Sequence, residues 1–255
     1  MSITVILNGY RRGSNLDEQY EALQNQTVKP DEILLWYNNP ENADPNYEIG
    51  TKIPTAYCTH NFGVWARFAF ALMAKSKYVC VFDDDTVPGR RWLENCVNTM
   101  KTHYGLLGTV GLLYKNPLPA DHQMCSYYEY YERFGWVNPN NYPVQVDLVG
   151  HSWFFEKEWL SDYWREQPDP KYNLCGEDMH FSYILQKYRN IPTFVPPHPI
   201  NEPELWGSVR GNYGADENSL WETNKVSSNG SYFKQAMHDY FVEQRRKGWR
   251  LINER

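Results

Sequence analysis

The sequence predicts an α/β fold in which a mostly parallel sheet is flanked by helices. Two observations lead to this prediction. Over about the first hundred residues, apolar runs of the buried-strand type alternate with helix-like stretches in the order β-α-β-(β)-α-β-α. The 255 residues are 42% hydrophobic and 22% charged, a composition typical of globular chains and not of disordered ones. Parallel strands joined through helices then imply right-handed crossovers.

The elements of the first half follow from local composition. Ile3 to Leu7 is a continuous apolar run, and a loop from Asn8 to Gly13 follows it. Ser14 or Asn15 is expected to cap a helix that runs to about Gln26. Similar patterns predict strands at Glu32–Tyr37, Pro54–Thr59 and Tyr78–Phe82, and helices at Asn61–Ala74 and Arg90–His103.

The second half has a less regular pattern. Strands are predicted at Gly105–Tyr114, Val144–Val149 and Thr193–Val195, and helices at Glu156–Arg165, Cys175–Tyr188 and Gln235–Lys247. The aromatic stretch from Met124 to Trp136 fits neither pattern clearly. Neither a repeat nor an interdomain linker is visible, so residues 1–255 are expected to form a single domain with two lobes.

Charge and cysteine content narrow the class of protein. The net charge of −6 argues against nucleic-acid binding, which normally requires a basic surface. The five cysteines form no CxxC pair and are expected to be buried free thiols in a reducing compartment. Neither a signal peptide nor a transmembrane segment is recognisable, so a soluble, cytoplasmic protein is expected. Oligomeric state is not encoded in any of these features.

Three consecutive aspartates, Asp83, Asp84 and Asp85, directly follow the strand predicted at Tyr78–Phe82. Carboxylates this close repel one another unless a positive group lies among them. A hard divalent ion such as Mg²⁺ or Mn²⁺ prefers such oxygen ligands, and ligands of open α/β sheets bind beyond the carboxyl ends of the strands. The alternative is an acidic turn that caps the helix after Pro88. The strand context favours the ligand-binding interpretation.

These residues carry a resemblance to a known family. The strand at 78–82 with Asp83-Asp84-Asp85 resembles the D-x-D motif of glycosyltransferases of the GT-A fold. Asn61, Gly63, Ala66 and Arg67 resemble the family-2-type pattern that precedes this motif. Val149–Phe155 and Gly176-Glu177-Asp178 occupy the places of the acceptor-side strand and the "ED" helix. The similarity covers roughly residues 2 to 200, and its part from Val146 to Pro199 is also similar to exostosin-like and some viral or bacterial sugar transferases.

The resemblance implies a GT-A fold and a transferase activity. Residues of about 1–104 would bind the nucleotide and about 105–200 the acceptor, followed by a loop and C-terminal helix over 201–255. The implied enzyme moves a sugar from a nucleotide-diphosphate donor, with a UDP-sugar as the first expectation, to a hydroxyl of a glycan or other acceptor. Mn²⁺ or Mg²⁺ is the implied cofactor.

The resemblance also implies roles for residues on the donor side. Asp85 is expected to bind the metal, and Asp83 to share it or to reach ribose or sugar hydroxyls. Asp84 is placed at the cofactor without a defined contact. Asn8, Tyr10 and Arg11 would surround the nucleotide base, and Asn38 stands where many relatives have an aspartate that faces uracil.

Further residues are implied around the reacting groups. Arg67 would lie near the diphosphate or brace the aspartates, with a core salt bridge as its alternative. His198, between two prolines, would complete the metal shell, although a lone histidine is often structural. His151 and Trp153 would line the acceptor or donor-sugar pocket.

Glu177 and Asp178 begin a helix whose N-terminal dipole stabilises a carboxylate. In an inverting enzyme Asp178 would remove the acceptor proton, and in a retaining one it would orient the acceptor or intermediate. The sequence leaves both outcomes open, and a plain helix cap is the structural alternative.

Two other functions are compatible with parts of the sequence. A sugar nucleotidyltransferase also uses metal-binding aspartates, but it usually opens with a glycine-rich, basic phosphate loop that Asn8–Gly13 does not match. A non-catalytic carbohydrate-binding protein would explain the 16% aromatic content, since rings stack on sugar faces. Such a protein has no need of three aspartates at a strand end, so glycosyl transfer is favoured.

Overall fold

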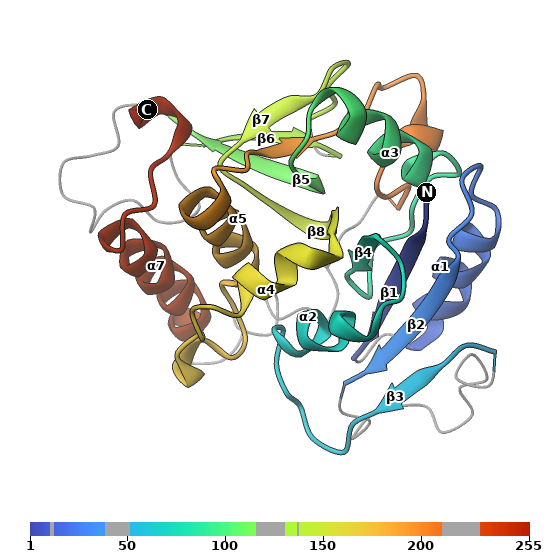
Figure 1. Cartoon of the computed structure of the whole chain (residues 1–255), viewed down its shortest axis with the longest axis horizontal. Coiled ribbons are helices and arrows are strands. Elements are labelled where there is room, and N and C mark those ends of the chain that lie inside the picture. The colour runs from blue at the N-terminus through green and yellow to red at the C-terminus, as the bar shows by residue number, and fades with distance from the viewer. Residues whose placement is uncertain (11–12, 39–51, 116–130, 137, 211–229) are drawn as a thin grey trace.

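The computed structural model describes residues 1–10, 13–38, 52–115, 131–136, 138–210 and 230–255. These residues build one sheet with the strand order β3-β2-β1-β4-β8-β5-β9-β7, and β6 pairs with β5 outside this path (Figure 1). The strands are β1 (Ile3–Gly9), β2 (Glu32–Tyr37), β3 (Thr55–Tyr57), β4 (Tyr78–Phe82), β5 (Leu106–Tyr114), β6 (Tyr131–Gly135), β7 (Val144–Val146), β8 (Leu148–Glu156) and β9 (Thr193–Val195).

The N-terminal half of the sheet is parallel, as the alternating pattern predicts. β1 lies between β2 and β4 and pairs with both in parallel, and β2 pairs in parallel with β3. β1 and β4 are buried along almost their whole length, which is why they are continuous apolar runs without alternation. The carboxyl ends of β1, β2 and β4 therefore meet at one edge of the sheet.

The second half adds antiparallel pairs. β8 is inserted between β4 and β5 and is antiparallel to both, while β9 is parallel to β5. The strand predicted at Val144–Val149 is in fact two strands, because the short β7 ends at Val146 and the long β8 begins at Leu148. The mixed α/β architecture confirms the predicted fold class.

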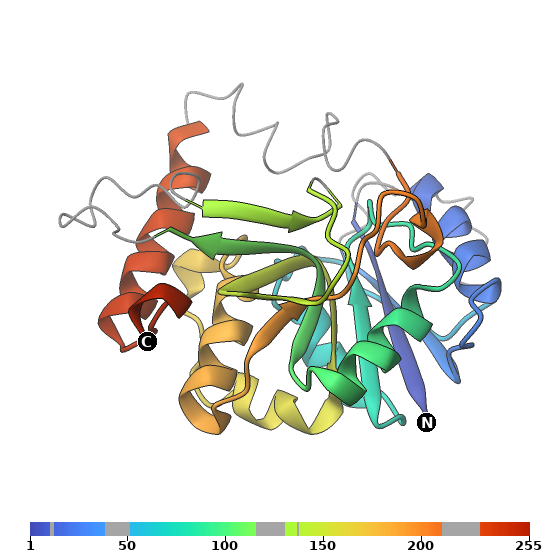
Figure 2. The same cartoon turned by 90° about the horizontal axis from the view of Figure 1, so that it is seen from above.

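The helices flank the sheet. They are α1 (Gly13–Gln24), α2 (Ala66–Phe70), α3 (Trp92–Thr102), α4 (Leu160–Tyr163), α5 (Glu177–Arg189) and α7 (Gly230–Arg246). The N-terminal elements β1, β2 and α1 lie at the opposite end of the molecule from α7 in both views (Figures 1 and 2). None of the helices in the described ranges is long and apolar enough to cross a membrane.

One predicted helix is much shorter than expected. The pattern over Asn61–Ala74 yields only α2 and a following 3₁₀ turn at Ala71–Met73. Residues before α2 form a turn in which Gly63 has a φ of +75°, and a Cβ at Gly63 would lie 2.1 Å from the Asn173 carbonyl oxygen. This turn needs glycine and is incompatible with a helix.

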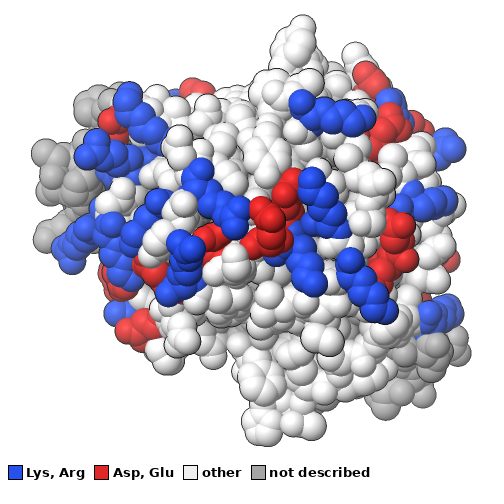
Figure 3. Space-filling view, in the orientation of Figure 1, with Lys and Arg blue, Asp and Glu red and all other residues white. Residues whose placement is uncertain are grey.

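The core is continuous across the sheet and contains large rings such as Trp92, Trp153 and Trp159. Cys58, Cys80, Cys96 and Cys175 are buried and free, which confirms the predicted burial and free state of these four thiols, and Cys125 lies outside the described residues. Over the region of α4, α5 and α7, basic side chains gather with acidic ones among them (Figure 3). The ion pairs Lys187–Glu166 and Arg189–Glu158 are examples of this mixing.

Candidate active site

The loop after β4 carries the three aspartates and is fixed by side chains of α1. The buried Asn15 donates to the Asp84 carbonyl oxygen at 2.9 Å. Gln19, also buried, donates to the carbonyl oxygens of Asp83 and Thr86, at 2.7 Å each. Asn15 and Gln19 lie four residues apart on one helix face, so α1 presents two amides to the loop at once. These three hydrogen bonds hold the backbone of the loop in place.

His151 faces this loop from β8 in a strained backbone conformation. Its φ is +66°, which is uncommon for a residue with a Cβ. The strain coincides with a register shift between β5 and β8 opposite Gly108 and Val110. The His151 carbonyl oxygen accepts hydrogen bonds from the Asp83 amide (3.1 Å) and the Thr86 hydroxyl (2.9 Å). A bulge next to a site changes the direction in which a side chain points. Here the hydrogen bonds from the aspartate loop hold His151 in its strained conformation.

Asp83, Asp85 and His151 form a group whose ligand atoms all lie within 4.8 Å of one another. The His151 Nδ1 is 3.6 Å from the Asp83 Oδ2. Two carboxylates and an imidazole are donors that Mn²⁺ accepts, and the residues fit a divalent cation by spacing and charge. His151, which was expected to line a sugar pocket, therefore lies beside Asp83 and Asp85.

Arg67 of α2 is the buried cation of the site. Its guanidinium forms one ion pair with the Asp83 Oδ1 and another, at 2.8 Å, with the Glu177 Oε1. Burial would lower the pKa of Arg67, but the two carboxylates outweigh burial and raise it. Arg67 was expected either to brace the aspartates or to form a core salt bridge. Its ion pairs with Asp83 and Glu177 do both, because they are buried and one of them holds an aspartate of the loop.

Glu177 is buried behind Asp83, whereas Asp178 reaches the surface of the site. Burial raises the pKa of Glu177, and the carboxylates of Asp178 and Asp83 add to this rise while Arg67 opposes it. Within the part of the chain that the structure describes, the Arg67 guanidinium pairs with two of these carboxylates, and a bound cation would reduce the repulsion among the others. A Cβ at Gly150 would lie 3.8 Å from the Asp178 Oδ2, so Asp178 stands beside the residue that precedes His151.

The expected base-binding residues lie at the ends of β1 and β2. The Asn38 amide group donates to the Asn61 Oδ1 (3.0 Å), and the Asn38 Oδ1 accepts from the Phe62 amide (2.9 Å). Asn61 in turn donates to the Tyr10 hydroxyl at 3.1 Å. Asn38 therefore holds the turn at 61–63 with both ends of its amide. Asn8 is half-buried at the end of β1, and Arg11 lies outside the described residues.

His198 and Trp153 are placed differently from their expected roles. The His198 Nδ1 donates to the Pro196 carbonyl oxygen at 2.8 Å, and its Nε2 accepts from the Gly207 amide at 3.1 Å. Both ring nitrogens are thus engaged by backbone, and neither faces the aspartates. The Trp153 side chain is buried under the Arg67 guanidinium, 4.6 Å from ring centroid to Cζ, and has no surface for a sugar. Trp153 supports Arg67 instead.

The placement of His198 makes stability a function of pH. Burial lowers its pKa to about 4, whereas the unfolded state takes up the proton near 6.5. Between these values the unfolded state binds more protons, so wild-type stability that is present above about pH 6.5 is lost as the pH falls. Relative to His198→Gln, the wild type should lose about 2–3 kcal/mol between about pH 7 and pH 4.5. Urea unfolding at both pH values measures this, and an unchanged difference would contradict the buried neutral imidazole.

Sequence reasoning missed Asn15, Gln19 and the ion pair of Arg67 with Glu177. α1 begins before Asn15, so Asn15 is not the expected N-cap but a brace for the aspartate loop. A weak signal was present, since Asn15 and Gln19 lie four positions apart and therefore share one face of the predicted helix. The pairing of Arg67 and Glu177 spans 110 positions and has no local signal.

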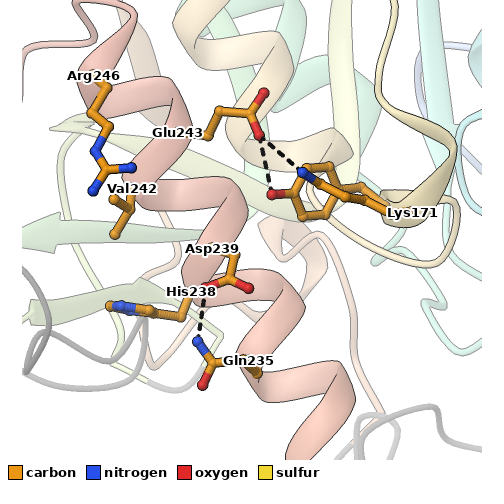
Figure 4. A pocket seen from close by; sticks show the side chains of 8 residues that line it. Lys171, Gln235, His238, Asp239, Val242, Glu243 and Arg246 are labelled. Atoms are coloured by element: carbon orange, nitrogen blue, oxygen red, sulfur yellow. Dashed lines mark hydrogen bonds and ion pairs between the residues drawn. The ribbon is translucent and has the colours of Figure 1, made fainter.

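A separate hollow of about 430 Å³ lies between the turn at Lys171 and α7 (Figure 4). Its polar groups partly pair with one another, since Glu243 binds both Lys171 (3.6 Å) and the Tyr172 hydroxyl (3.1 Å). The hollow contains none of the expected site residues. Its lining residues are Lys171, Tyr172, Gln235, His238, Asp239, Val242, Glu243 and Arg246.

Comparison with known proteins identifies the family of the chain. The profile described as "Glycosyl transferase family 2" matches residues 4–164, which is more than half of the chain. The chain therefore belongs to glycosyl transferase family 2, whose enzymes transfer sugars from nucleotide-activated donors. The matched range ends before α5, so Glu177 and Asp178 lie outside it.

Two solved structures share the fold. They are S. aureus TarS 1-349 alone and S. aureus TarS 1-349 in complex with UDP, both 15% identical, with TM-scores of 0.52 and 0.51. Each match covers 77% of this chain but only 58% of the TarS chain. No curated protein matched the sequence.

Proposed function

We propose that this protein transfers a sugar from a UDP-sugar to a hydroxyl of a glycan or other acceptor, with Mn²⁺ or Mg²⁺ bound by Asp83, Asp85 and His151. The observation that carries the proposal is the convergence of these three side chains at the carboxyl end of β4, where α/β sheets bind ligands. Uridine is supported by the related fold of TarS, which has been solved with UDP.

A bound cation would neutralise charge on the leaving diphosphate. The protein's own part is to keep Asp83 and Asp85 available. Arg67 binds the Asp83 Oδ1 and leaves the Oδ2 on the side of His151. The amides of Asn15 and Gln19 fix the loop backbone, so the carboxylates do not need to reorganise when the donor arrives. Preorganisation of this kind stabilises developing charge at low cost.

Asp178 is the proposed residue for the acceptor hydroxyl. It is half-exposed at the start of α5 and stands beside Gly150. In an inverting reaction it would take the hydroxyl proton, and in a retaining one it would orient the acceptor. Glu177 is paired with Arg67 and buried, so its proposed role is to hold Arg67 in place.

The nucleotide base is proposed to bind beside Tyr10 and the turn at 61–63. Phe62 in this turn is 58% exposed, so its ring is accessible to a ligand. Asn38 acts by holding this turn. Residues of about 1–104 would thus form the nucleotide-binding half of a single domain, with about 105–200 for the acceptor and 201–255 as loop and C-terminal helix.

Release of UDP from donors tests the proposal. Purified protein is incubated with UDP-sugars and with GDP- and TDP-sugars, each with Mn²⁺ or with EDTA, because many transferases slowly hydrolyse their donor without an acceptor. We expect UDP release that requires the cation, and stabilisation against thermal unfolding by UDP and Mn²⁺ together of about 3 kcal/mol at a hundredfold excess over Kd. If UDP with Mn²⁺ does not stabilise the protein, and if no UDP release depends on the cation, the proposal fails.

A further inference from the structure

The segment at Trp206–Arg210 lies against the far side of the aspartate loop. The Gly89 amide donates to the Trp206 carbonyl oxygen at 2.9 Å, and the Val209 amide donates to the Val87 carbonyl oxygen at 2.8 Å. The Val87 amide donates to the hydroxyl of the fully buried Ser208 at 3.1 Å. The aspartate loop is therefore held between this segment on one side and α1 on the other.

Arg210 joins these two supports. Its Nη1 donates to the Asn15 Oδ1 at 2.7 Å, and its Nε donates to the Glu18 Oε2 at 3.0 Å. Asn15 uses the other end of its amide on the Asp84 carbonyl oxygen. Because the amide is planar, Arg210 fixes which end of Asn15 faces the loop: the oxygen is committed to the guanidinium, so the nitrogen must point at Asp84.

We propose that Arg210 is a positioning residue for the aspartate loop, acting through Asn15 on the Asp84 backbone. The guanidinium is one hydrogen bond removed from the loop and, in this geometry, touches no carboxylate of Asp83, Asp84 or Asp85. The sequence separation of 195 positions between Arg210 and Asn15 explains why no local pattern reveals it. The consequence for ligand binding rests on the proposed function, but the consequence for the loop does not.

The relay makes a specific prediction about pairs of variants. Loss of Arg210 frees the Asn15 amide to rotate, and loss of Asn15 removes the relay altogether. Arg210→Met and Asn15→Ala should therefore each weaken binding of UDP with Mn²⁺ by about three- to tenfold, the range of one lost hydrogen bond. The double variant should be no weaker than Asn15→Ala alone, because coupled residues are not additive. Arg210→Lys, which keeps the charge but not the two-pronged contact, should recover only part of the loss.

The first measurement is amide hydrogen exchange of the peptide that spans residues 83–89, made on protein without any ligand. We expect faster exchange of this peptide in Arg210→Met and in Asn15→Ala. The double variant should exchange as fast as the single variants, and exchange in β4 should equal that of the wild type in all three. Arg91→Met is the matched control, because Arg91 pairs with Glu94 and Glu202 beside the same segment but not with α1. This control should leave exchange at 83–89 unchanged.

Calorimetric titration with UDP and Mn²⁺ then completes the test. Unchanged exchange in Arg210→Met overturns the proposal, as do additive losses of affinity or an equal effect of Arg91→Met. Weaker binding with unchanged exchange would mean that Arg210 contacts the ligand directly, which also overturns it. If the wild type binds no UDP with Mn²⁺, the proposed function fails, while the exchange result still decides the relay.

Discussion

Replacing Asp85 with asparagine should lower the rate of UDP release from a UDP-sugar on the order of a thousandfold. An amide is a weaker ligand than a carboxylate, and a catalytic cation is worth several kcal/mol, with about 1.4 kcal/mol per tenfold in rate. Mn²⁺-dependent binding of UDP should fall in parallel. The measurement is steady-state UDP release together with calorimetry.

The folded state should survive this substitution. Asp85 is almost fully buried next to Asp83 and Asp84, so removal of one charge relieves repulsion in the protein without ligand. The unfolding temperature should therefore equal or exceed that of the wild type. Asp17→Asn, at an exposed position on α1, is the matched control and should leave UDP release unchanged. An Asp85→Asn variant with wild-type turnover would contradict the role of Asp85.

Replacing Arg67 with methionine should destabilise the protein by about 3–5 kcal/mol, because it leaves two carboxylates without their buried cation. The Arg67 side chain is only 5% exposed, and its partners Asp83 and Glu177 are 24% and 11% exposed. Methionine still packs on Trp153, so the cost comes mainly from charge. Urea unfolding near pH 7 measures it. Arg91→Met, whose ion pairs are more exposed, should cost no more than about 1 kcal/mol.

A double variant separates charge from packing. The double variant Arg67→Met/Glu177→Gln also removes the more buried of the two carboxylates that lose their partner. It should therefore recover much of the stability that Arg67→Met loses. Activity should not return, because Asp83 still lacks the guanidinium that holds its Oδ1. Stability of the double variant equal to that of Arg67→Met alone would show that the cost comes from lost packing.

The parallel half of the fold could be read from the sequence because each strand carries its own signal. β2, β4 and β9 have the predicted boundaries, since buried runs flanked by turn residues are local features. β7 and the first residues of β8 were predicted as one strand, because the strands with which they pair come from distant parts of the chain. The shortened α2 reflects the close approach of the turn at 61–63 to Asn173, which is also a long-range contact.

In the candidate site, too, the features that local sequence determines were predicted, and those that depend on long-range contacts were not. The run of Asp83, Asp84 and Asp85 was recognised from local pattern because it directly follows a strong strand, whereas the separate roles of Asp83 and Asp85 came from the family resemblance. His198 was expected at the metal and His151 at a sugar pocket, because both histidines follow strand-like runs and the sequence does not show what surrounds each ring. His198 is buried, and both of its ring nitrogens form hydrogen bonds with the backbone. His151 has a positive φ, and its side chain lies beside the aspartates. Fixing His151 in this way needs the register shift between β5 and β8, which exists only in the assembled sheet.

The most direct test of the account is anomalous diffraction from crystals grown with Mn²⁺ and UDP. We expect a manganese peak at coordination distance, about 2.0–2.4 Å, from the carboxylates of Asp83 and Asp85 and the imidazole of His151, with the diphosphate of UDP on the same ion. A peak bound by His198, or UDP bound without manganese at Asp85, would contradict it.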